Sequence, residues 1–118
     1  MDTTNRAPVG SCLVIHENAL VAEDIRDVVS DFGATDVRVF RTLADARDQL
    51  AWLVILAGSY DQVLADPITQ RWLSAGASLI VLNGRHRDST SGSNVYSLEQ
   101  PFRSDELEGL LTSTGLFP

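Results

Sequence analysis

The sequence predicts an α/β fold, a doubly wound sheet of parallel strands with helices on both faces. Three observations support this. Continuous apolar runs at 11–15, 53–57 and 79–82 are typical of strands that helices cover on both faces. Segments with helical periodicity alternate with these runs, which is the pattern of βαβ units. The 118 residues suffice for one domain with its own core.

The first half of the chain predicts two strand–helix units and a third strand. After the strand at 11–15, one helical face carries Val21, Ile25, Val28, Val29 and Phe32. Gly33 follows, where a helix end favours positive φ. Residues 36–40 alternate polar and apolar side chains and predict an edge strand. Thr42 predicts the N-cap of a second helix, and the boundary of this helix with the strand at 53–57 is left open. Its apolar positions are Leu43, Ala46, Leu50 and Leu53.

The second half predicts one more complete unit and a final helix. Asp66 and Pro67 favour the start of a helix that Gly76 ends, before the strand at 79–82. Residues 84–94 are polar or small without apolar period, and they predict a loop. A fifth strand is expected at 95–98. Ser104 predicts the N-cap of a last helix, with inward positions at Leu107, Leu110 and Leu111.

Composition excludes several classes of function. The net charge is −7, with 16 acidic against nine basic residues, so no nucleic-acid partner is expected. All nine basic residues are arginines, which excludes any mechanism that needs a lysine. The single Cys12 excludes an internal disulfide and a cysteine-cluster metal site, and we expect it in the core. No apolar run approaches 18 residues, so no membrane-spanning segment is expected. The polar start of the sequence lacks the pattern of a secretion signal, and we therefore expect a cytoplasmic location.

Ligands of such sheets bind beyond the carboxyl ends of the strands. The residues there are His16-Glu17-Asn18, Ala57-Gly58-Ser59, Asn83-Gly84 and Gln100-Pro101.

These strand ends resemble the receiver domain of two-component response regulators. Residues 13–21 are similar to that family's first strand, which ends in an acidic pair, and to the start of its first helix. Residues 79–84 resemble its fourth strand, which ends in a switch threonine or serine. Residues 98–107 resemble its lysine–proline–phenylalanine turn and last helix. The resemblance covers about residues 11–114 and implies a flavodoxin-like five-stranded domain at 11–118, after a polar lead at 1–10.

The resemblance also implies where phosphorylation chemistry would lie, and there this sequence departs from the family. The family's acceptor aspartate falls on Ala57, or on Gly58 if the register slips by one, and neither has a side-chain oxygen. Its acidic Mg²⁺-binding pair has become His16-Glu17, which leaves one carboxylate. Asn83 replaces its switch hydroxyl and Gln100 its lysine. The chain is therefore identified as a degenerate member, a pseudo-receiver, with no metal or cofactor expected.

The family's fourth helix is also expected to be shortened or absent. Only 17 positions separate Asn83 from Gln100, and no helical apolar period lies between them. Ser97 stands where the family often has a switch aromatic residue. The neighbouring Tyr96 points to the other face of the strand.

Several residues have both a functional and a structural interpretation. In the functional interpretation, His16 and Glu17 form half of a metal site or an acid–base pair. In the structural interpretation, His16 is only a hydrogen-bonded residue at the end of a strand. A basic group is formed by Arg85, His86 and Arg87. It either contacts an anion or an acidic partner, or it belongs to a solvated loop. Four aromatic residues either anchor an interface or pack in the core: Tyr96, Phe102, Trp52 and Trp72. We expect both tryptophans on helices. Asp61 and Asp66 are candidate replacement acceptors, with Asp66 better explained as a helix cap.

Three functions are compatible with these patterns. The first is a signal-transduction protein that acts by phosphorylation-independent protein–protein interaction, with a histidine kinase or a phosphotransfer protein as the expected partner. The second is an unorthodox phosphorelay receiver phosphorylated at Asp61 or His16. The third is an oligomerisation or interaction subunit unrelated to phosphorelay, for which a homodimer is possible. No enzyme is expected, because phosphate-loop, acid-pair and triad spacings are missing from the sequence.

Overall fold

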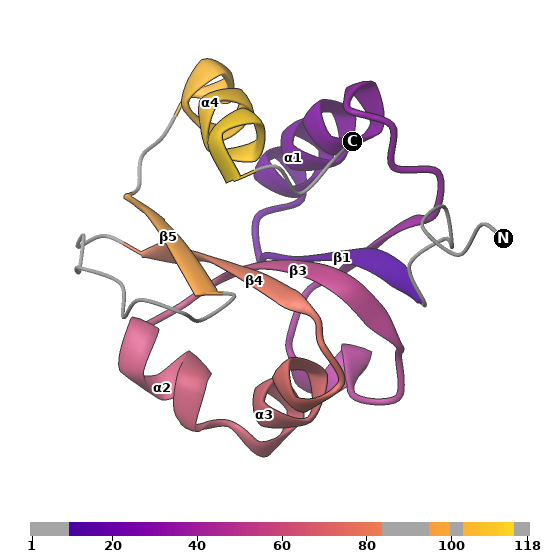
Figure 1. Ribbon diagram of the computed structural model, residues 1–118, viewed down its shortest axis with the longest axis vertical. Helices are drawn as coiled ribbons and strands as arrows, with labels where there is room; N and C mark the ends of the chain where they lie inside the picture. Colours follow the sequence, from indigo (N-terminus) through magenta and orange to yellow (C-terminus); the bar gives the residue numbers. More distant parts are fainter. Residues whose placement is uncertain (1–9, 84–94, 100–102, 115–118) are drawn as a thin grey trace, which may run out of the picture.

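The protein is a five-stranded, all-parallel sheet with helices on both faces (Figure 1). The structure is a computed structural model and describes residues 10–83, 95–99 and 103–114. The strands have the order β2-β1-β3-β4-β5, which confirms the predicted flavodoxin-like fold. The strands are β1 (Ser11–Ile15), β2 (Val37–Phe40), β3 (Ala51–Ala57), β4 (Ser78–Asn83) and β5 (Val95–Glu99). The α-helices are α1 (Ala19–Asp31), α2 (Tyr60–Ala65), α3 (Pro67–Ser74) and α4 (Ser104–Thr114).

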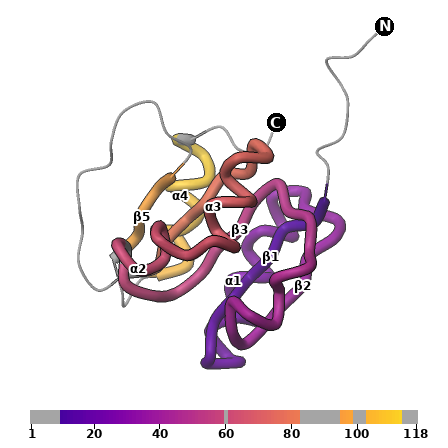
Figure 2. The backbone as a smooth tube through the Cα atoms, turned by 90° about the horizontal axis from the view of Figure 1, so that it is seen from below, coloured from indigo at the N-terminus to yellow at the C-terminus, as the bar shows by residue number. Residues whose placement is uncertain are grey.

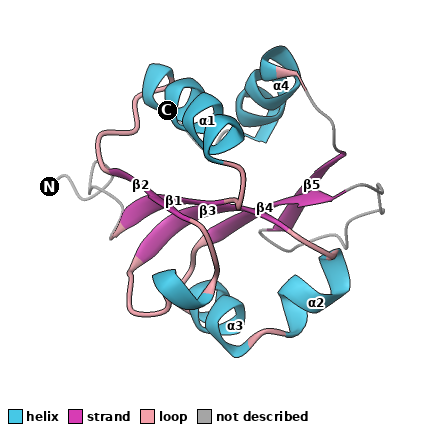
Figure 3. Cartoon of the chain, turned by 180° about the vertical axis from the view of Figure 1, so that it is seen from behind, coloured by secondary structure: helices cyan, strands magenta, loops and turns pink. Residues whose placement is uncertain are grey.

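Two apolar layers hold the helices to the sheet. Helices α1 and α4 cover one face of the sheet, and α2 and α3 cover the other (Figures 1 and 3). On the first face, Ile25 of α1 and Leu107 of α4 pack on the buried residues of β1, β3 and β4. On the second, Val63 of α2 and Trp72 of α3 pack on the alternate residues of the same strands. The three central strands are therefore apolar on both sides, as their continuous runs predict.

The predicted helix after β1 is confirmed as α1. Its buried positions are Ala22, Ile25, Val28 and Val29. The side chain of Asn18 caps the helix, accepting hydrogen bonds from the backbone N–H of Leu20 at 3.0 Å and of Val21 at 3.4 Å. Gly33 follows at φ 115°, the left-handed conformation expected after the helix.

The predicted second helix is wrong. Only a 3₁₀ turn at Ala44–Ala46 forms between β2 and β3, and we call residues 41–50 the β2–β3 crossover. Leu53 belongs to β3, and Leu50 is exposed. Strand β3 lies between β1 and β4, and pairing with β1 extends it back to Ala51. Too few residues then remain for a helix of normal length.

The crossover is held to the protein by side-chain bonds instead of a helix. The Thr42 hydroxyl accepts the N–H of Asp45, in the 3₁₀ turn, at 3.2 Å. The indole N–H of Trp72 donates to the Gln49 carbonyl at 2.9 Å, and the Arg71 guanidinium donates to the Arg47 carbonyl. Trp72 is a buried helix residue, as predicted. Trp52 is a half-buried residue of β3, so its predicted helical location is wrong.

Two short helices, α2 and α3, replace the single helix expected between β3 and β4. The Asp66 side chain accepts the N–H of Ile68 at 2.8 Å and Pro67 follows, which confirms the predicted start of α3. Helix α2 was not predicted, because six residues are too few to show a helical period.

The buried hydroxyl of Thr69 in α3 yields a stability prediction. Thr69 is 0% exposed, and its Oγ1 has no hydrogen-bond partner among the described residues. Because an unsatisfied buried hydroxyl is costly, Thr69→Val is expected to raise the free energy of unfolding by about 1 kcal/mol. Urea unfolding measures this change, with Thr69→Ser as the control that keeps the hydroxyl. A loss of stability in the valine variant would show that the hydroxyl is bonded.

One edge of the sheet is the strand that the sequence predicts there. Strand β2 is the predicted edge strand, and β5 lies at the opposite edge (Figures 2 and 3). In α4, Leu107 and Leu111 are buried and Leu110 is half-buried, as predicted. The Arg103 carbonyl accepts the N–H of Glu106 and of Leu107, so Arg103 rather than Ser104 occupies the cap position. The expected loop at 84–94 and the shortened fourth helix lie outside the described residues.

A polar network at the amino ends of the strands fixes β2 beside β1. The Ser11 hydroxyl donates to the Asp36 carboxylate at 2.7 Å, and Arg38 donates to the same carboxylate at 3.2 Å. Arg38 also donates to the Gln49 side chain at 3.0 Å. The bonds from Ser11 and then Arg38 lower the pKa of the Asp36 carboxyl.

The lowered Asp36 pKa predicts a pH dependence. A carboxyl whose folded-state pKa is depressed stabilises the fold above its unfolded pKa, and the stabilisation disappears as the pH falls through the folded value. At neutral pH, Asp36→Asn is therefore expected to be less stable than the wild type. The difference should shrink as the pH falls from neutral into the acidic range, because the wild-type carboxyl then takes up its proton. Urea unfolding of both proteins across this range tests it, and a constant difference would contradict it.

Candidate functional site

The carboxyl ends of the strands bring the predicted positions together. Ile15 of β1 pairs with Leu56 of β3, so the next residues, His16 and Ala57, lie side by side. The N–H of His16 donates to the Phe40 carbonyl at 3.0 Å, which places Arg41 beside it on the other flank. Asn83 ends β4 at the same edge of the sheet. Gln100 lies outside the described residues.

His16 is a half-buried residue that shapes the turn between β1 and α1. Its Nδ1 accepts the backbone N–H of Asn18 at 3.0 Å. A ring nitrogen that accepts a hydrogen bond carries no hydrogen of its own, so this bond leaves the N–H of the ring on Nε2. Asn18 in turn caps α1. His16 therefore positions the first turn of the helix.

The described part of the site lacks the groups that hold Mg²⁺ and accept a phosphoryl group. Glu17 is exposed, and Ala57 stands half-buried at the end of β3. Among the described residues, no three His, Cys, Asp or Glu side chains are grouped so that they could hold a metal ion. One carboxylate beside an imidazole and a methyl group offers too few hard oxygen ligands for Mg²⁺.

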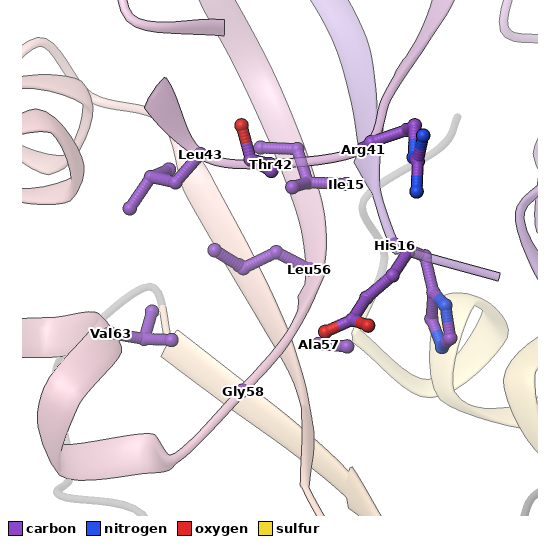
Figure 4. Close-up of a pocket in the computed structure, with 10 residues that line it drawn as sticks. Ile15, His16, Arg41, Thr42, Leu43, Leu56, Ala57, Gly58 and Val63 are labelled. Atoms are coloured by element: carbon purple, nitrogen blue, oxygen red, sulfur yellow. The ribbon is translucent and has the colours of Figure 1, made fainter. Parts of the chain in front are cut away.

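A pocket of about 310 Å³ opens at this edge (Figure 4). It lies between the carboxyl ends of β1 and β3, the start of the crossover, and α2. Its apolar lining is Ile15, Leu43, Leu56 and Val63. Its polar lining is His16, Glu17, Arg41 and Thr42, and Ala57 and Gly58 complete it. A helix at 42–53 would have placed the lining residues of the crossover differently, so the pocket depends on the corrected path of this segment.

Arg41, Thr42, Leu43 and Val63 are pocket residues that sequence reasoning missed. A signal for Arg41 was present, because it directly follows the strand expected at 36–40 and the carboxyl-end rule applies to that strand too. Leu43 was assigned to the predicted helix. Val63 lies on α2, which no pattern in the sequence revealed.

Of the other predicted residues, those that the structure describes do not join this site. Tyr96 of β5 is half-buried and packs on the apolar layer beneath α1 and α4. Asp61 is exposed on α2, and Asp66 is the cap of α3. Burial raises the pKa of the Cys12 thiol to about 12, so it is a core residue and not a nucleophile. Arg85, His86, Arg87 and Phe102 lie outside the described residues.

The outer side of α1 is exposed and acidic. Leu20 in its first turn is 78% exposed. Asp24, Asp27 and Asp31 follow it at helical spacing on the same stripe, and all three are exposed. We call these four residues the α1 stripe.

Comparison with known proteins assigns no family. No protein-family model matches the chain, and no curated protein matches its sequence. Within the described residues, no helix has the length and apolar character needed to cross a membrane.

Proposed function

We propose that this chain is a cytoplasmic signal-transduction protein of receiver-like fold that acts by binding a protein partner without being phosphorylated at the receiver position. The observation that carries the proposal is Ala57 at the end of β3, where the resembled family has its acceptor aspartate. A methyl group has no oxygen to attack a phosphorus atom. The single carboxylate of Glu17 beside it supports the same conclusion.

The α1 stripe is the proposed docking surface. An exposed leucine surrounded by charge is a suitable interface anchor, since apolar residues at the centre of an interface carry much of its binding energy. The aspartates of the stripe complement a partner helix that carries basic residues. The proposed partner is a histidine kinase or a phosphotransfer protein, as the resemblance implies.

A phosphodonor experiment tests whether the protein accepts a phosphoryl group. The purified protein is incubated with Mg²⁺ and acetyl phosphate, and its intact mass is then measured. We expect no added phosphoryl group, whereas a receiver with an aspartate acceptor run in parallel gains one. A stable adduct on this chain would contradict the proposal and favour phosphorylation at Asp61 or His16. Asp61→Asn then distinguishes these two sites.

A matched pair of leucine variants tests the docking surface. Leu20 and Leu50 are both exposed, at 78% and 67%, but Leu50 precedes β3 at the opposite end of the sheet. In affinity capture from native cell extract, Leu20→Glu is expected to lose the partner and Leu50→Glu to retain it. A buried interface leucine replaced by a charge costs about 2–4 kcal/mol, or roughly 30- to 1,000-fold in affinity. Equal recovery by both variants, or recovery of proteins unrelated to phosphorelay, would overturn this choice of surface or partner.

A further inference from the structure

The pocket beside His16 has two unlike ends. Leu43 and Val63 lie on one side of it, while Arg41 and His16 lie on the other (Figure 4). Leu56 forms the wall between them. A pocket of about 310 Å³ is at the small end of the range for ligand pockets, roughly 300–1,000 Å³. It therefore suits a small molecule with one apolar end and one polar end.

The lining of the pocket offers one charge of each sign, at Arg41 and Glu17. Among the described residues, neither the Arg41 guanidinium nor the Glu17 carboxylate has an ion-pair or hydrogen-bond partner. Both side chains line the pocket. An arginine binds a carboxylate through two parallel N–H donors, and a carboxylate accepts hydrogen bonds from an ammonium group. A ligand with both an ammonium and a carboxylate would satisfy both residues.

We propose that this pocket binds an α-amino acid with a branched aliphatic side chain, with its carboxylate at Arg41, its ammonium at Glu17 and its side chain against Leu43, Leu56 and Val63. A zwitterion also suits the charge of the protein. With a net charge of −7, the chain repels a simple anion, but it exerts little net force on a neutral zwitterion. The inference goes beyond the proposed protein–protein function and does not depend on it.

Titration with L-leucine tests the proposal. Isotopically labelled protein is followed by two-dimensional NMR, and the backbone amides that should shift are those of the pocket. A ligand of this size is expected to have a dissociation constant on the order of 1 mM. Two analogues separate the charges: 4-methylpentanoate lacks the ammonium group and 3-methylbutylamine lacks the carboxylate. Each should bind at least about tenfold more weakly than leucine, since each leaves one charge unpaired.

Variants assign the two charges to their residues. Arg41→Gln and Glu17→Gln should each weaken leucine binding by about tenfold. Arg41→Gln should leave binding of 3-methylbutylamine unchanged, because that probe has no carboxylate. Arg26→Gln on α1 and Glu108→Gln on α4 are controls at exposed positions outside the pocket and should bind leucine as the wild type does. All four substitutions are at exposed residues, and dispersed amide spectra verify that the variants fold.

Three results would overturn the proposal. The first is that no pocket amide shifts with leucine up to about 20 mM, well above the expected dissociation constant. The second is that 4-methylpentanoate binds as tightly as leucine, which identifies an apolar carboxylate as the ligand class instead. The third is that the control variants weaken binding as much as the pocket variants do. None of these results bears on the α1 stripe, so the two proposals succeed or fail separately.

Discussion

Replacing Trp72 with alanine is expected to lower the free energy of unfolding by about 3–5 kcal/mol, the usual loss for a fully buried large aromatic side chain. Trp72 is 3% exposed and packs in the apolar layer between α3 and the sheet. Its indole N–H donates to the Gln49 carbonyl at 2.9 Å. That bond holds the β2–β3 crossover, which has no helix of its own. One side chain therefore stabilises both α3 and the path of the crossover.

Two further variants separate the packing of Trp72 from its hydrogen bond. Trp72→Phe keeps most of the apolar contact but leaves the Gln49 carbonyl without its donor, so a loss of about 1–2 kcal/mol is expected. Leu73→Ala, at a half-buried position of the same helix, should cost less than Trp72→Ala. Urea unfolding at neutral pH measures all three. If Trp72→Ala is no worse than Leu73→Ala, Trp72 does not anchor the crossover.

Gly10→Ala is the second change with a large expected effect, about 2–4 kcal/mol of lost stability. Gly10 has φ 95°, a left-handed conformation that costs an L-residue about 1–2 kcal/mol. An added Cβ would also lie 2.5 Å from the carbonyl carbon and from the oxygen of Leu50. The obstacle is backbone, so no side-chain rotation removes it. The adjacent bond from the Ser11 N–H to the Leu50 carbonyl, 2.9 Å long, would be strained as well.

Gly76→Ala is the matched control for Gly10→Ala. Gly76 has nearly the same φ, 97°, but an added Cβ there meets nothing within 4 Å. Gly76→Ala should therefore lose only the conformational contribution, about 1–2 kcal/mol. Chemical unfolding of the two variants gives the cost of the backbone contact as their difference. If the two variants lose the same free energy of unfolding, the backbone at Gly10 and Leu50 can move apart at little cost.

The parts of the fold that the sequence predicted correctly have strong local signals. The strands β1, β3 and β4 are continuous apolar runs that are buried in the structure. The apolar face of α1 has helical spacing and is also buried. The start of α3 was predicted because Asp66 and Pro67 act locally, through a side-chain cap and a restricted φ. The edge position of β2 followed from its alternating pattern.

The error at residues 42–53 shows where local signals fail. Leu43, Ala46, Leu50 and Leu53 have helical spacing, and the segment contains few residues that disfavour a helix. In the folded chain, Ala51–Leu53 gains backbone hydrogen bonds to a neighbouring strand and burial in the middle of the sheet. These gains come from strands distant in sequence and outweigh the local preference.

By itself, the sequence determined the class of fold and the position of Ala57, His16 and Glu17 at the carboxyl ends of strands. These follow from short-range patterns and from the rule that parallel strands end at one edge. Only the tertiary structure decided how the β2–β3 crossover runs, that Arg41 and Leu43 join Val63 around one pocket, and that Trp72 holds this arrangement. A pocket is a relation between segments far apart along the chain, and its shape depends on strand pairing and packing that no local pattern encodes.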